Sequence, residues 1–141
     1  MSAQESAAYA GRKEGPDLSG ADLEGANLRG SNLEDADLSW AEMWCARLEG
    51  ADLTHAHLRR AVLTEADLRG AHLPRVRAEG ADLERADLSR ATARGLHLVL
   101  ADLRDADLSC ADLCGADLSG AAWDATTRWP EGIGPLGGGT A

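Results

Sequence analysis

Apolar residues recur at every fifth position over most of this chain. Read in a five-residue frame, residues 16–125 form twenty-two consecutive units with no insertion or deletion, as in ADLRDADLSCADLCGADLSG at residues 101–120. The central position is Leu in eighteen units, and the residue two places earlier is Ala in eighteen. The chain is therefore read first as a tandem repeat.

A period of five excludes both regular elements. On an α-helix a step of five residues turns the chain by about 140°, so successive leucines would share no face. On a continuous strand side chains alternate with a period of two, so an odd repeat would send successive leucines to opposite faces. The pattern instead predicts a short extended step that directs Ala and Leu inward, followed by one corner in every repeat.

The runs ADLEGANLRG, ADLERADLSR and ADLRDADLSCADLCGADLSG resemble the repeats of pentapeptide-repeat proteins. The resemblance covers residues 16–125 and implies an all-β fold, a right-handed quadrilateral β-helix with four repeats per coil. Coils of twenty residues then begin at Pro16, Ala36, Ala56, Val76 and Leu96, with a partial sixth from Ala116. The chain contains no Phe, which departs from the Phe-containing centres common in the topoisomerase-binding branch of that family.

Three parts are predicted along the chain. Residues 1–15 form a polar segment, either a helical turn over the first coil or a disordered tail; residues 16–125 form the β-helix; residues 126–141 form a C-terminal cap and a flexible Gly-rich tail. Trp123 and Trp129 mark the end of the repeat, where an open coil would expose strand edges. We expect both rings to close the core, or alternatively to join two copies end to end, so monomer and homodimer both stay open.

Charge is segregated by the twenty-residue register. The side that begins at Ala21 and recurs every twenty residues carries nine acids against Arg85 and Arg104, which is −7 of the chain's net −10. We call it the acidic side; its acids are Asp22, Glu24, Glu42, Glu65, Asp82, Glu84, Asp102, Asp105 and Asp124. The side that begins at Pro16 instead holds a basic strip of His57, Arg59, Arg60, Arg77 and His97.

Two interpretations of the acids are open. Asp one residue before the central Leu belongs to the repeat, where it can bond corner backbone groups and keep the rod soluble. Alternatively, an acidic rod can imitate DNA, which carries one charge per about 1.7 Å and hence about 15 over a rod of roughly 26 Å. Because the net charge of −10 lies within a factor of two of that density, magnitude allows mimicry.

Exposed apolar residues are the second candidate for contact. Trp40 and Trp44 flank a corner of the second coil at outward positions, and we call this pair the Trp corner. The irregular repeats around Ala78 and Ala93 are expected to repack without distortion, with Val76 filling part of the gap left by Ala78. Alternatively, they distort the coil and expose Val99 and Leu100 as a further contact patch. Tryptophan is enriched at binding sites, although packing against residues 1–15 would also account for the Trp corner.

Catalysis finds no support in the sequence. A filled rod offers no cleft, and the chain has no Gly-rich phosphate loop between a strand and a helix. Cys110 with Cys114, and His55 with His57, lack convincing metal-ligand spacing. We expect no enzyme activity, cofactor or metal. The chain has no apolar run of membrane-spanning length, and three cysteines without a C-x-x-C pair suit a reducing compartment, so we expect a cytoplasmic protein.

The sequence therefore predicts a non-enzymatic interaction module. Its partner would be a protein that binds the acidic side or the Trp corner. The alternative, implied by the family resemblance, is a DNA mimic that occupies the DNA groove of a type II topoisomerase, DNA gyrase, and protects it from inhibitors. A structural spacer is the second alternative. Neither direct nucleic-acid binding nor membrane insertion is expected.

Overall fold

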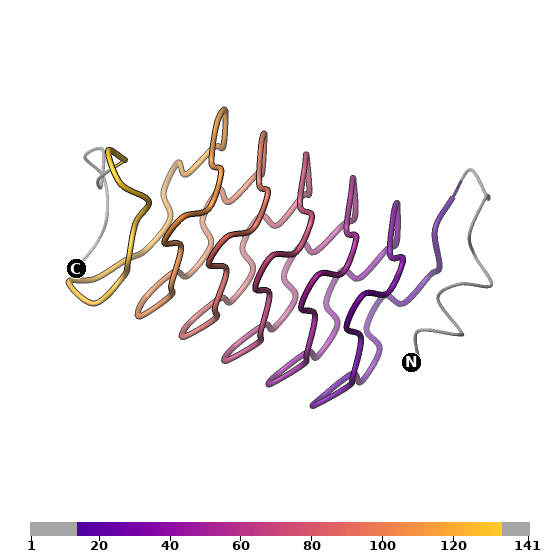
Figure 1. Ribbon diagram of the computed structural model, residues 1–141. Coiled ribbons are helices and arrows are strands. Elements are labelled where there is room, and N and C mark those ends of the chain that lie inside the picture. Colours follow the sequence, from indigo (N-terminus) through magenta and orange to yellow (C-terminus); the bar gives the residue numbers. More distant parts are fainter. Residues whose placement is uncertain (1–13, 134–141) are drawn as a thin grey trace.

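The computed structural model describes residues 14–133, which form a stack of rectangular coils (Figure 1). Each coil meets the next through isolated parallel β-bridges that join a residue to the one twenty positions later, from Asp17↔Asp37 to Asp102↔Ala122. The extended steps are single bridge residues, with no longer strand assigned in residues 14–133. The fold is a right-handed quadrilateral β-helix with twenty residues per coil, as predicted.

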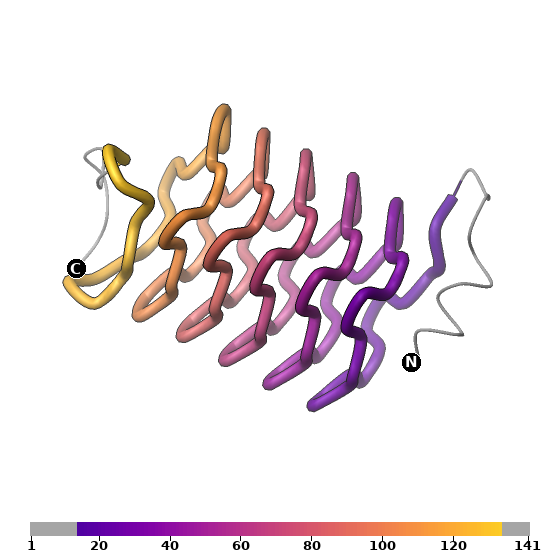
Figure 2. The backbone as a smooth tube through the Cα atoms, viewed as in Figure 1, coloured from indigo at the N-terminus to yellow at the C-terminus, as the bar shows by residue number. Residues whose placement is uncertain are grey.

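Backbone hydrogen bonds tie each coil to the next. The Leu28 N–H donates to the Arg47 carbonyl at 2.7 Å, the Arg47 N–H donates to the Ala26 carbonyl at 2.9 Å, and the Gly30 N–H donates to the Glu49 carbonyl at 2.9 Å. The same three bonds recur on all four sides, so the coils seen edge-on in Figure 2 are joined along their whole perimeter. Backbone polar groups are thus paired without any long strand.

Every corner between Gly20 and Gly120 is a type II turn. At the first one the Leu18 carbonyl accepts the Ala21 N–H at 3.0 Å, and φ is +66° at Gly20, the third residue of the turn. A positive φ at the third residue alone defines type II. A third turn residue with positive φ recurs at every fifth position, and in twelve of the corners it is not glycine. The corner resets the side-chain parity, as the five-residue period requires.

The core is a narrow column of Leu and Ala. One ladder consists of Leu28, Leu48, Leu68, Leu88 and Leu108, each at most 1% exposed. Two central positions hold Ala78 and Ala93 in place of Leu, and the neighbouring columns supply the larger buried side chains Val76 and Leu96. The side-chain volume lost at the two central positions is thus replaced by larger residues at the positions that usually hold Ala. The β-bridges continue through these repeats without interruption. The predicted burial of the leucines is confirmed.

The acids of the repeat bond the corner backbone. Asp17 Oδ1 accepts the Ser19 N–H at 3.1 Å, and Asp107 Oδ1 accepts the Ser109 N–H at 2.9 Å. All thirteen Asp or Asn residues that precede a central Leu accept the N–H two residues ahead in this way. This local bond is the structural role predicted for the repeat Asp.

The register changes once, at the C-terminal end. The last bridge, Asp107↔Arg128, spans twenty-one residues instead of twenty. On either side of Arg128 in the sequence, the rings of Trp123 and Trp129 meet edge to face, with centroids 5.4 Å apart and planes at 85°, and both pack against the core. The Gly-rich tail and nearly all of the predicted N-terminal segment lie outside the described residues. No helix within residues 14–133 could span a membrane.

Candidate functional site

Three large apolar side chains stand out on the surface of residues 14–133. Leu100 is 68% exposed, Trp40 is 65% exposed and Trp44 is 45% exposed. Val99 is half-buried, and the backbone bonds of its coil are regular, with the Gly80 N–H donating to the Val99 carbonyl at 2.9 Å. The alternative in which a distorted coil exposes Val99 beside Leu100 is therefore not found. The exposed apolar surface is therefore Leu100 and the Trp corner.

Trp40 belongs to a column of turn residues, and the next residue of that column contacts its ring. Trp40, Arg60, Gly80 and Leu100 take the third turn position at the same corner of four successive coils. The Arg60 guanidinium carbon lies 5.8 Å from the centre of the Trp40 ring, which is cation–π geometry. The Trp40 ring is thus supported by its neighbour while most of its surface faces solvent.

Gly80 opens a notch in this column. The notch has a volume of about 230 Å³ and is lined by Arg59, Arg60, Glu79, Gly80 and Leu100. A Cβ atom added at Gly80 would lie 3.0 Å from Arg60 Cδ, so a side chain there would meet Arg60 and occupy the opening. Sequence reasoning missed the notch, because a Gly at this position is explained by the turn alone. The twenty-residue register, which aligns Gly80 with Arg60 and Leu100, is the signal that could have found it.

The acidic side is partly neutralised by its two arginines. Arg104 Nη2 lies 2.6 Å from Asp102 Oδ2 and 3.5 Å from Glu84 Oε2. Arg85 lies 3.6 Å from both Glu65 and Asp105. The hydrogen bond from Arg104 lowers the pKa of Asp102 below its ordinary value. Four acids of the later coils are therefore set in ion pairs, namely Glu65, Glu84, Asp102 and Asp105. The other five acids of this side have no such partner within residues 14–133: Asp22, Glu24, Glu42, Asp82 and Asp124.

One acidic cluster has the spacing of metal ligands. Carboxylate oxygens of Asp82, Glu84 and Asp102 lie within 4.8 Å of one another. Arg104 already supplies positive charge to Glu84 and Asp102, and Asp82 Oδ1 is taken by the Glu84 N–H at 3.0 Å. The cluster is therefore explained by the repeat and its ion pairs without a metal ion.

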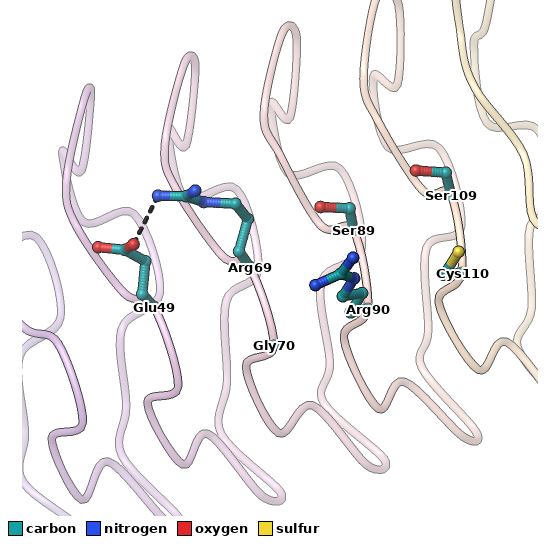
Figure 3. A pocket seen from close by; sticks show the side chains of 7 residues that line it. All are labelled: Glu49, Arg69, Gly70, Ser89, Arg90, Ser109 and Cys110. Atoms are coloured by element: carbon teal, nitrogen blue, oxygen red, sulfur yellow. Dashed lines mark hydrogen bonds and ion pairs between the residues drawn. The ribbon is translucent and has the colours of Figure 1, made fainter.

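A polar groove runs across another corner (Figure 3). Its volume is about 530 Å³ and it is lined by Glu49, Arg69, Gly70, Ser89, Arg90, Ser109 and Cys110. Arg69 reaches across to the Glu49 carboxylate and also bonds Asp67, which raises the pKa of Arg69 and lowers that of Asp67. No His lines this groove, so the Cys110 thiol has no imidazole base beside it.

The three cysteines are free, exposed thiols. Loss of hydration, followed by the charge and hydrogen bonding of nearby Glu65, raises the pKa of Cys45 above its ordinary value. Its sulfur lies 3.8 Å from a Glu65 carboxylate oxygen. Because the thiolate is the nucleophile, a raised pKa makes Cys45 a poor one at neutral pH. Cys110 and Cys114 were not predicted to bind metal, and no metal-ligand cluster in the described part of the chain includes them.

Comparison with protein families gives one match. The family of pentapeptide repeats matches residues 14–44, 41–77 and 81–120, with eight copies in all. Together these segments cover well over half of the chain. A search of curated proteins found no significant match.

Solved structures with the same architecture were also found. The chain is 30% identical to a pentapeptide repeat protein of the Arabidopsis thaliana thylakoid lumen, over 76% of this chain and 64% of that one, which is less than two thirds of its length, with a TM-score of 0.39. It is 32% identical to a pentapeptide repeat protein of Nostoc PCC 7120, over 87% and 81% of the two chains, with a TM-score of 0.34.

A third solved structure is that of QnrB1, a plasmid-mediated fluoroquinolone resistance protein. Its chain is 22% identical to this one over 83% of this chain and 70% of that one, with a TM-score of 0.44. Since all three TM-scores lie below 0.5, the function of this chain has to be argued from its own residues.

Proposed function

This chain belongs to the pentapeptide-repeat family, and from that premise we propose that it is a non-enzymatic interaction module whose partner is a protein. The observation that carries the proposal is the Trp corner, where Trp40 is 65% and Trp44 45% exposed. Tryptophan dominates the energetics of protein interfaces, because a large ring buries much area with few rotatable bonds. Two such rings on the outside of a coil suit a contact surface.

The support of Trp40 by Arg60 strengthens this assignment. Ordering a free side chain on binding costs about 0.5–1.5 kcal/mol. A ring already in cation–π contact with Arg60, 5.8 Å away, has lost part of that freedom before a partner arrives. The same contact leaves the outer ring surface available.

The residues described here offer little for catalysis. The thiol of Cys45 has a raised pKa, and Arg69 in the polar groove is held by Glu49 and Asp67. Both features favour a binding role over covalent chemistry.

A second candidate is mimicry of DNA by the acidic side, with DNA gyrase as the partner. The specific observation behind it is the close approach of Asp82, Glu84 and Asp102, whose carboxylate oxygens lie within 4.8 Å of one another. Arg85 and Arg104 weaken the negative field there. Mimicry would therefore have to use the early coils, around Asp22, as well as this cluster.

Affinity capture with matched variants tests the primary proposal. The full chain, the double variant Trp40→Ala/Trp44→Ala and the control His55→Ala are each immobilised and exposed to lysate. His55 is an exposed ring at the same turn position, with φ +59° beside the +62° of Trp40. A protein kept by the wild type and by the His55 variant but lost by the double variant supports the proposal. Identical capture by all three contradicts it, once circular dichroism shows that each variant is folded.

A further inference from the structure

The basic strip and the notch at Gly80 lie on one side of an otherwise acidic chain. In the two middle coils, residues 56–60 and 76–80, the three arginines of the strip stand beside one acid, Glu79, so this part of the surface carries a net +2 with the histidines neutral. The side as a whole is net −1, because the flanking coils add Asp17, Asp37 and Asp117. The chain as a whole carries −10. A locally positive area on a negatively charged protein attracts negatively charged partners, whereas the rest of the surface repels them.

The arginines differ in how far they are already engaged. Glu79 lies 3.5 Å from Arg77 Nε and 4.0 Å from Arg59 Nε. Arg60 makes no ion pair within residues 14–133, and its described contact is the Trp40 ring. Its guanidinium is therefore free to donate hydrogen bonds to a carboxylate from outside. One Glu79 oxygen is buried without a hydrogen-bond donor, so the two arginines leave part of this carboxylate unpaired.

The notch next to that guanidinium has both charged and apolar walls, since Leu100 and the aliphatic stem of Arg60 line it together with Arg59 and Glu79. Arg60 Cζ lies 3.5 Å from the position that a Gly80 Cβ would take, which places the guanidinium between the notch and the Trp40 ring. On the other flank, Leu100 Cδ2 lies 2.8 Å from where a Gly120 Cβ would be. Leu100 thus leans over Gly120, while the Arg60 side chain lies over Gly80, with its Cδ, Nε and Cζ 3.0–3.5 Å from the position of an added Cβ. Both side chains line the notch.

We propose that this corner binds an acidic peptide segment that places one bulky apolar side chain in the notch at Gly80. The anchor would pack against the stem of Arg60 and against Leu100, while flanking carboxylates pair with Arg60 and Arg77. The proposal rests on the proposed function in that the partner is a protein. A polymer such as nucleic acid fits less well, because its phosphates would extend onto a rod with net charge −10 and it carries no aliphatic anchor.

Selection from a random peptide library displayed on phage tests the chemistry of the partner. The full chain serves as bait. The selected peptides should share several Asp or Glu residues around one large apolar residue, and their affinity should fall as salt rises. Selected peptides that are neutral or basic would overturn the proposal. So would a failure of the library to enrich on this bait.

Two matched pairs of variants locate the site. Gly80→Ala fills the notch, and Gly50→Ala is its control, since Gly50 has a similar φ of +64° but nothing within 4 Å of an added Cβ. Arg60→Gln removes the free charge, and Arg90→Gln is its control at the same turn position on another side. Gly80→Ala and Arg60→Gln should each weaken a selected peptide about tenfold, and the controls should bind as the wild type. Equal affinity for Gly80→Ala and Gly50→Ala would sink the assignment.

Further probes separate this surface from the alternatives. Single-stranded oligonucleotides and vesicles of anionic lipid should bind far more weakly than the selected peptide; tight binding of either that Gly80→Ala abolishes would replace the peptide as the occupant. Peptides that are lost with Trp44→Ala but not with Gly80→Ala would overturn the notch and leave the proposed function intact. If peptide binding depends on Gly80 but lysate capture does not depend on the Trp corner, the notch assignment stands and the role proposed for the Trp corner fails.

Discussion

The side chain of Asp124 accepts the backbone N–H of Asp105, a bond that a backbone carbonyl accepts in the other coils. Its Oδ1 accepts the Asp105 N–H at 3.2 Å, at the position where one coil earlier the Arg85 N–H donates to the Arg104 carbonyl at 3.0 Å. The same oxygen accepts the N–H groups of Thr126 and Thr127. A single carboxylate therefore accepts three backbone N–H groups where the twenty-residue register ends.

Replacing this carboxylate should loosen the C-terminal end of the stack. Asp124→Ala leaves those donors without their acceptor, so the melting temperature should fall. Asp105→Ala is the control, because Asp105 contributes its backbone N–H to this arrangement and its side chain only meets Arg85 at 3.6 Å. Circular dichroism during heating measures both. Equal shifts for the two variants would contradict the role given to Asp124.

Acid should destabilise the fold in a defined window. Hydrogen bonds from Thr126 and its neighbours lower the pKa of Asp124 to about 2 from an ordinary 3.8, and donors from Ser19, Arg69, Arg104 and Ser119 lower the pKa of further repeat acids, namely Asp17, Asp67, Asp102 and Asp117. The folded state thus binds protons less readily than the unfolded chain. The stability from these carboxylates is complete above the unfolded value and is lost as the pH falls through the folded one.

The melting temperature should accordingly drop between about pH 4 and pH 2. Asp124→Asn, which keeps an acceptor oxygen without the charge, should show a shallower drop than the wild type over the same range. A melting temperature that stays level or rises toward pH 2 would show that these hydrogen bonds do not favour the ionised form.

Ser31 is a polar residue in an Ala position of the core. It is 1% exposed, and its hydroxyl oxygen has no hydrogen-bond partner among residues 14–133. Burying an unpaired hydroxyl costs about 1–3 kcal/mol. Ser31→Ala should therefore raise the free energy of unfolding by about 1 kcal/mol, as measured by urea denaturation. Thr54→Ala, which removes a hydroxyl bonded to Asp52 at 2.6 Å, should not stabilise the protein.

The leucine ladder gives the sharpest test of register. Leu68 is 1% exposed and its neighbour Asp67 faces outward. Leu68→Lys buries a charge in a dry column, whereas Asp67→Lys loses a corner hydrogen bond and an ion pair with Arg69. The first change should abolish or severely reduce folding, and the second should cost about 1–2 kcal/mol. Comparable unfolding midpoints would mean that the two residues do not face opposite ways.

The acidic side can be tested for DNA mimicry without unfolding the rod. The variant Asp82→Asn/Glu84→Gln/Asp102→Asn/Asp105→Asn removes four charges, and Asn retains the oxygen that accepts the corner N–H at Asp82 and Asp102. Melting should change little. If gyrase is the partner, this variant should bind it more weakly, and wild-type binding should decrease with salt because opposed charges are screened over about 8 Å at physiological ionic strength.

A supercoiling assay completes that experiment. The wild type should inhibit gyrase or protect it from a fluoroquinolone, and the fourfold variant should not. A wild-type protein that neither binds gyrase at low salt nor alters supercoiling in the presence or absence of the drug removes this candidate. The acids would then be only the corner-bonding residues of the repeat.

The period of five was enough to predict the architecture and the core. Because each repeat places its Leu at the same point of the frame, the buried ladder through Leu68 follows from counting alone. The change of spacing from twenty to twenty-one residues at the C-terminal end could not be predicted in this way. Residues 124–127 contain no central Leu, so the hydrophobic pattern there does not show that a residue has been added. What changes the register there is the set of bonds made by Asp124 and Thr127, including the Thr127 hydroxyl that donates to the Leu103 carbonyl at 2.8 Å.

Surface features depended on side-chain directions that a repeat pattern does not contain. Trp40 and Trp44 were placed outward correctly. Exposure of Val99 with Leu100 required a distorted coil; the bridges are regular through these repeats, and Val99 is half-buried. The notch depends on Arg60 lying over Gly80, with its Cζ 5.8 Å from the centre of the Trp40 ring, and on Leu100 leaning toward Gly120. Neither direction can be read from composition or from the period.

The spacing of twenty between bridge partners makes the face of every residue a matter of counting. Deleting one pentapeptide would keep each remaining corner and each inward Leu, yet it would rotate everything after the deletion by a quarter turn about the axis. A deletion just before Ala101 would carry Asp102 and Asp105 off the acidic side and onto the side of the basic strip. Gain or loss of whole repeats can therefore rearrange the surface of this protein without one substitution, and only changes of a full coil leave its faces aligned.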